Sequence, residues 1–173
     1  RRVWRRAHIC GLLVAACLAF AAPATLTNAR SIQMRPCPGL EGARCGRASV
    51  PEDHGVRPGR TLGLSVLVLP ASRAGGSDPV FFFAGGPGEA ATRAAPTIAS
   101  TDFRRLNPTR DIVFIDQRGT GDSAPLTCPP PSDPQAYFGN VLGDAEALVA
   151  CRAALETQAD LTKYVTSIAA DDV

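Results

Sequence analysis

Two unbroken apolar runs, each followed at once by glycine-containing turns, constrain the fold of this chain more than any other feature. Residues 79–83 (PVFFF) lead into AGGPG at 84–88, and residues 111–115 (DIVFI) lead into DQRG at 116–119. Apolar runs of roughly four to eight residues are typical of strands that are buried on both faces, as in a parallel sheet covered by helices. The chain is therefore expected to build a sheet inside a folded domain.

The same pattern of apolar runs and turn residues predicts the other elements. Further strands are expected at residues 47–50 and 61–69, and a helix is expected at 89–100. Asp144 and Thr166 are expected to cap two more helices, and in the first of these Leu148, Cys151 and Leu155 share one face. A strand, a glycine turn, a helix and another strand in this order predict an α/β fold.

Residues 1–24 have the composition of an export signal. A basic start (RRVWRRAH) precedes an apolar run at residues 9–22, and small residues follow. At about fourteen residues, this run is shorter than the roughly twenty that a transmembrane helix needs. Small residues allow cleavage after Ala21 or after Ala24, of which we favour the second; the protein is then secreted or periplasmic, without a membrane span. Attachment of a lipid to Cys17 is the alternative.

Cysteines 37, 45, 128 and 151 stay in the chain once the signal is removed. An even number of cysteines in an exported chain indicates disulfides, and four cysteines allow three pairings. Pairing of sequence neighbours, 37 with 45 and 128 with 151, closes the smallest loops, but the connectivity stays open. The first pair lies in residues 25–47, a segment expected to be irregular. Because the sequence contains no CxxC and little histidine, no metal site is expected.

Charge and motif spacing bear on partners and cofactors. Residues 1–24 hold four of the 18 basic residues and none of the 16 acidic ones, so the mature chain is mildly acidic and no nucleic-acid partner is expected. Residues 119–124 (GTGDSA) match the GxGxxA spacing of a dinucleotide-binding turn. That turn must open a helix, whereas prolines follow at 125 and 129–131. We therefore expect no organic cofactor.

Several polar and glycine residues have simple structural interpretations. Asp116 and Arg118 are expected to tie the end of their strand to neighbouring loops through charge-assisted hydrogen bonds. His54 lies in a turn, where we expect it to be hydrogen-bonded or to face solvent. The glycines of AGGPG fit either an ordinary tight turn or a loop whose N–H groups face a ligand.

Taken together, these motifs resemble the proline iminopeptidase and tripeptidyl aminopeptidase branch of the α/β-hydrolase fold. The matching segments are CGRASVPED (45–53), VFFFAGGPG (80–88), DIVFIDQRGTGDS (111–123) and residues 164–172. The resemblance implies that residues 48–173 are the N-terminal part of an α/β-hydrolase domain, with an incomplete doubly wound, mostly parallel sheet. It also implies that this glycine loop supplies an oxyanion-hole N–H beside a nucleophilic serine, with Gly85 and Gly86 as the candidates for that donor.

The chain departs from the family pattern at several positions. Ala84 stands where many relatives have His, and Glu89-Ala90 stand where exported relatives often have Gln-Ser. Glu89 either begins the following helix, where an acidic residue suits the helix dipole, or alters the substrate preference. The family's nucleophile lies in a GxSxG elbow followed by an acid and a histidine, and no GxSxG occurs here. We expect the triad to follow Val173 and the 173-residue chain to be inactive alone.

The resemblance thus implies an exported serine hydrolase. In full-length form it would cleave residues from peptide N-termini through a Ser-Asp-His triad that lies beyond residue 173. Because an esterase uses the same oxyanion chemistry, both peptides and small esters stay open as substrates. A catalytically inactive binding relative is the other class of function that the sequence allows.

Overall fold

The computed structural model describes residues 32–73, 76, 78–86, 88–129 and 145–173. The expected signal peptide with Cys17 and Ala24, and the expected helix cap Asp144, lie outside the described residues. The strands and helices of the described chain are β1 (Arg35–Pro36), β2 (Arg44–Pro51), β3 (Thr61–Leu69), β4 (Val80–Phe82), α1 (Ala91–Ser100), β5 (Ile112–Ile115), α3 (Ala145–Glu156), the 3-10 helix η1 (Leu161–Lys163) and α4 (Thr166–Ala170).

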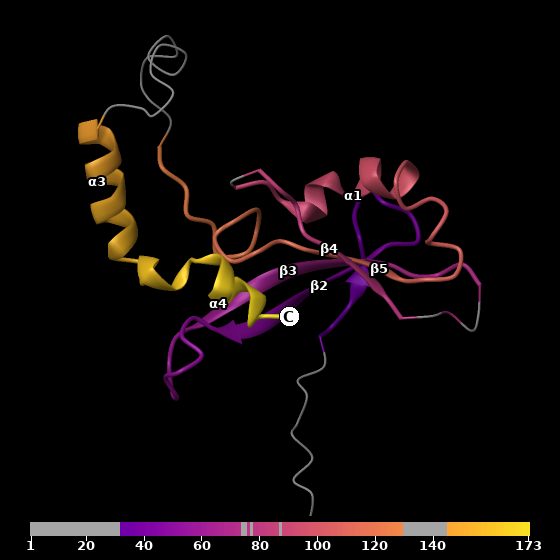
Figure 1. Ribbon diagram of the computed structural model, residues 1–173, viewed down its shortest axis with the longest axis horizontal. Coiled ribbons are helices and arrows are strands. Elements are labelled where there is room, and N and C mark those ends of the chain that lie inside the picture. Colours follow the sequence, from indigo (N-terminus) through magenta and orange to yellow (C-terminus); the bar gives the residue numbers. More distant parts are fainter. Residues whose placement is uncertain (1–31, 74–75, 77, 87, 130–144) are drawn as a thin grey trace, which may run out of the picture. The chain divides into compact units, whose positions relative to one another are not determined.

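The strands form one mixed sheet in the order β1-β2-β3-β5-β4 (Figure 1). β2 is antiparallel to β1 and β3, and β3 is antiparallel to β5, so β4–β5 is the one parallel pair among the described strands. The expectation of a mostly parallel, doubly wound sheet as the N-terminal part of an α/β-hydrolase fold is therefore wrong.

The connections explain these strand directions. A parallel pair needs a crossover of about a dozen residues or more, usually with a helix. Residues 52–60, which join β2 to β3, are too few for such a crossover, so the chain turns back as a hairpin. α1 lies between β4 and β5 in the sequence and supplies a helical crossover for the parallel pair.

Each face of the sheet carries a hydrophobic core. On one face α1 packs Ala91 and Ala95 against a cluster that includes Leu69, Ile112 and Phe114. On the other face a second cluster joins residues of β2, β3 and β5, with Tyr164 packed against it. Burial on both faces explains the unbroken apolar run of β5. β4 lies at the sheet edge instead, and Phe81 is 49% exposed.

Element boundaries confirm part of the sequence prediction and correct the rest. β3 occupies the expected residues 61–69, while residues 25–47 contribute β1 and the start of β2 rather than being irregular throughout. α1 begins at Ala91 and has no acidic residue in its first turn, so the interpretation that Glu89 begins this helix is wrong. Thr166 is not a cap either, because the N-cap of α4 is Val165.

Two disulfides cross-link the described chain. They join Cys37 to Cys45 and Cys128 to Cys151, which are the pairs that close the smallest loops. Disulfides of this kind are consistent with an extracellular or secreted protein. Within the described ranges, no helix combines the length and the apolar character that a membrane span requires.

Candidate functional site

Two loops lie at the same edge of the sheet because they follow neighbouring parallel strands. Residues 84–90, here called the glycine loop, follow β4, and residues 116–123, here called the strand-end loop, follow β5. The carboxyl ends of parallel strands meet at one edge of a sheet, and in open sheets ligands bind outside that edge. These two loops are therefore the first place to look for a functional site.

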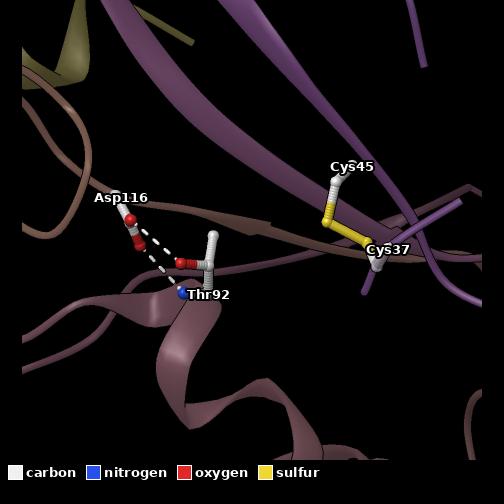
Figure 2. Close-up of a disulfide and its surroundings, with 4 residues drawn as sticks. All are labelled: Cys37, Cys45, Thr92 and Asp116. Carbon is white, nitrogen blue, oxygen red and sulfur yellow. Dashed lines mark hydrogen bonds between the residues drawn. A yellow bond between two sulfur atoms is a disulfide. The ribbon is translucent and has the colours of Figure 1, made fainter. Parts of the chain in front are cut away.

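Asp116, at the end of β5, links the strand-end loop to α1, the helix that follows the glycine loop. Its side chain is completely buried, and Oδ1 accepts a hydrogen bond from the Thr92 backbone N–H at 2.8 Å. Oδ2 accepts from the Thr92 hydroxyl at 2.9 Å and from the Asp122 N–H at 3.2 Å. Figure 2 shows the carboxylate facing the first turn of α1. A buried carboxylate is well placed there, since the first N–H groups of a helix lack intrahelical partners and attract negative charge.

Arg118 anchors the strand-end loop on its other side, and all five of its N–H groups donate hydrogen bonds. Nε and one Nη2 hydrogen bind the two oxygens of Asp172, at 2.8 and 2.6 Å. The others bind the backbone carbonyls of Glu52, Lys163 and Pro51. The Asp172 carboxylate raises the pKa of the Arg118 guanidinium. The prediction that Asp116 and Arg118 tie the strand end to neighbouring loops is confirmed.

His54 and Ser123 also have structural partners. His54 Nε2 lies 3.0 Å from Asp172 Oδ1, so the prediction of a hydrogen-bonded turn histidine is confirmed. Ser123 is completely buried, and its Oγ accepts the Ser65 N–H at 2.7 Å. Its hydroxyl is therefore not available as a nucleophile.

The glycine loop differs, because it carries backbone donors without partners. Gly85 and Gly86 are exposed, and their N–H groups donate no hydrogen bond within the described part of the chain. The Gly86 carbonyl accepts the Glu89 N–H at 3.1 Å, which closes a turn. Gly86 has a φ of +78°, a conformation that residues with a Cβ rarely adopt. The loop can therefore offer two successive N–H groups to a negatively charged oxygen.

Glu89 adds a negative charge to the glycine loop. The residue is exposed, and its Oε2 lies 3.6 Å from the position that a Cβ on Gly86 would take. Arg93, four residues further on, lies 3.8 Å from Asp122 rather than pairing with Glu89. Among the described residues no cation pairs with the Glu89 carboxylate, so it can meet a positively charged group of a ligand.

Other parts of the described chain offer less. An open cleft of about 610 Å³ is lined by residues of α3, η1 and the turn between them, and neither loop contributes to it. In the described segments, no group of three or more His, Cys, Asp or Glu side chains could hold a metal ion. No protein-family model matches the chain, and the curated proteins contain no match either.

The sequence identified some members of this site and missed others. Gly85, Gly86, Asp116 and Arg118 were expected from their motifs. Thr92 was not identified from the sequence. It lies near the start of the expected helix at 89–100, where backbone N–H groups need an acceptor from outside the helix. Asp172 was missed because nothing local marks a partner that lies 54 residues from Arg118.

Proposed function

We propose that this chain belongs to an exported serine hydrolase and supplies its oxyanion-binding loop. The observation that carries the proposal is the pair of exposed N–H groups of Gly85 and Gly86, which lack partners in the described chain. Preorganised donors of this kind stabilise the negative oxygen that forms during acyl transfer, and one donor contributes about 3 kcal/mol. The resemblance of AGGPG and DQRGTGDS to segments of proline iminopeptidases and tripeptidyl aminopeptidases supports the same role.

In the proposed reaction, a serine that lies beyond Val173 attacks the carbonyl carbon of the substrate. A histidine takes the serine proton and passes it to the leaving amine, and a carboxylate orients that histidine. The carbonyl oxygen becomes an oxyanion that accepts hydrogen bonds from the Gly85 and Gly86 N–H groups. Water then attacks the acyl carbon of the acyl-enzyme. The histidine takes the water proton and returns it to the serine, and the carboxylic acid product leaves.

Glu89 favours peptide N-termini over simple esters as substrates. A peptide N-terminus carries an ammonium group on the carbon next to its first carbonyl. Glu89 Oε2 lies 3.6 Å from the position that a Cβ on Gly86 would take, so in this proposal the carboxylate attracts the ammonium of a substrate whose carbonyl oxygen binds the glycine loop. An ion pair with an exposed carboxylate contributes up to about 1 kcal/mol. An uncharged ester gains nothing from it, so we propose an aminopeptidase rather than an esterase.

Turnover by the full-length protein tests this proposal. We expect it to release 7-amino-4-methylcoumarin from prolyl or alanyl amides, and to act poorly on N-acetylated amides and on p-nitrophenyl acetate. The 173-residue chain is expected to show no turnover. Hydrolysis of the ester alone would contradict the aminopeptidase proposal in favour of an esterase, and no turnover of any substrate would favour a binding relative.

Substitution of Glu89 separates substrate preference from the oxyanion chemistry. Glu89→Gln keeps the shape of the side chain and removes its charge. We expect kcat/KM for the free-amine substrate to fall about two- to fivefold, which corresponds to the loss of an exposed ion pair. The kcat/KM for the N-acetylated substrate should stay unchanged. Equal losses on both substrates would contradict the role proposed for Glu89.

A further inference from the structure

We propose that Asp116 and Thr92 are positioning residues for the Gly85 and Gly86 N–H groups. This inference rests on the proposed function and names the device that holds the oxyanion loop in place. Neither residue touches the substrate in this account. They act through the first turn of α1, which directly follows the glycine loop in the chain.

The path from Asp116 to Gly86 runs through hydrogen bonds and two buried alanines. The buried carboxylate binds both the N–H and the hydroxyl of Thr92. Ala90 and Ala91, which precede Thr92, are 4% and 1% exposed and cannot shift without disturbing the packing. The Glu89 N–H then bonds to the Gly86 carbonyl. The position of Gly86 is therefore set by groups that begin at Asp116.

The strand-end loop holds the same assembly from a second side. Gly121 lies so close that a Cβ there would be 2.3 Å from Asp116 Oδ2 and 2.7 Å from the Cβ of Ala90. The Asp122 N–H adds a third hydrogen bond to the carboxylate. Asp116 is thus held by its own loop as well as by Thr92. Oxyanion donors need such support, because their contribution depends on being aligned before the reaction starts.

Three variants of the full-length enzyme test the inference. Thr92→Val removes the hydroxyl while keeping the branched shape, and Thr92→Ser restores a hydroxyl. The matched control is Thr120→Val, because the Thr120 hydroxyl donates to the Gln117 carbonyl at 2.9 Å inside the strand-end loop. Each variant is assayed for kcat and KM on the aminoacyl amide, and its stability to urea is measured in parallel.

We expect Thr92→Val to lower kcat about tenfold while KM changes less than twofold. The misplaced N–H groups would stabilise the transition state less without weakening substrate binding. Thr92→Ser should recover most of the lost kcat, and Thr120→Val should leave kcat unchanged. A Thr92→Val enzyme that is less stable to urea but keeps a kcat within twofold of the parent would overturn the inference, because Thr92 would then be merely structural.

Hydrogen exchange tests the coupling without any turnover. In the Thr92→Val chain we expect the Glu89 amide, which bonds to the Gly86 carbonyl, to exchange at least tenfold faster than in the parent. Thr120→Val should leave that rate unchanged. An unaltered Glu89 rate in Thr92→Val would overturn the inference. If the parent enzyme shows no turnover while Glu89 responds as expected, the proposed function fails and the positioning contact stands.

Discussion

The glycine loop and the strand-end loop follow adjacent parallel strands, yet their polar groups differ in burial and in hydrogen bonding. In the strand-end loop, Asp116 and Arg118 are buried and bonded on every side. In the glycine loop, Gly85 and Gly86 are exposed and their N–H groups have no partner among the described residues. One loop is saturated with hydrogen bonds, and the other leaves two N–H groups exposed to solvent.

The difference follows from the cost of burying polar groups. A charge removed from water must be paired and hydrogen-bonded. Removing one partner of such a pair leaves the other charge buried and uncompensated, which lowers the stability of the fold. An exposed N–H group has no such requirement, because water satisfies it until a ligand replaces the water. Saturated hydrogen bonding therefore marks the structural part of this sheet edge, and exposed donors mark the part that can bind.

The largest effect is expected at Arg118. Arg118→Met leaves the Asp172 carboxylate, only 3% exposed, without its bidentate partner. We expect the free energy of unfolding to fall by about 3–5 kcal/mol, as is usual when one member of a buried pair is removed. Urea denaturation measures the loss. Adding Asp172→Asn should recover part of it, whereas a loss below about 1 kcal/mol in the single variant would contradict the structural role.

Alanine at Gly121 and at Gly86 sharpens the comparison between the loops. At Gly121 the new Cβ would overlap Asp116 Oδ2 and Ala90, and φ is +51°, so we expect a loss of about 3 kcal/mol. At Gly86 only the backbone strain applies, with an expected loss of about 1 kcal/mol. Urea denaturation distinguishes the two, and equal losses would show that both loops are packed alike.

A smaller, pH-dependent effect is expected at Asp53, which follows Glu52, a residue whose carbonyl accepts a hydrogen bond from Arg118. Lys163 Nζ lies 2.8 Å from Asp53 Oδ2, and this hydrogen bond lowers the pKa of Asp53. Because the pKa is lower in the folded state, the pair stabilises the fold above about pH 4, the pKa of an unpaired aspartate. This stability is lost as the pH falls through the lowered pKa of the folded state.

Urea denaturation at pH 7 and pH 3 measures this contribution. Asp53→Asn should lose less stability between the two pH values than the parent does. Lys163→Met is the matched control, because it removes the other partner and should reduce the pH dependence in the same way. An unchanged difference between the two pH values in both variants would show that the ion pair does not contribute.

The sequence was enough to predict where strands lie but not how they run. The segments 61–69 and 111–115 form strands at nearly the expected residues, because the pattern of apolar residues within a short segment indicates whether it is buried. An apolar run indicates burial without indicating direction, so the antiparallel pairing of β3 with β5 could not be read from it. The exposure of Phe81 was missed for a similar reason, since the position of β4 at the sheet edge depends on the whole topology.

The candidate site divides in the same way. Gly85, Gly86, Asp116 and Arg118 could be identified from the sequence because they directly follow apolar runs, where a turn and charge-assisted hydrogen bonds are expected. Thr92 and Asp172 are common residues whose roles arise only when distant segments meet. Tertiary contacts of this kind leave no periodic or compositional trace in a single sequence.

The central claim is that the glycine loop stabilises an oxyanion formed by a serine nucleophile. It is tested most directly by labelling the full-length protein with a fluorophosphonate and mapping the modified residue. The account predicts one labelled serine, in a GxSxG elbow beyond Val173. It also predicts labelling about tenfold slower in Gly86→Ala than in Gly85→Ala, whose Cβ meets nothing within 4 Å. Absence of a labelled serine, or equal rates in the two variants, would contradict it.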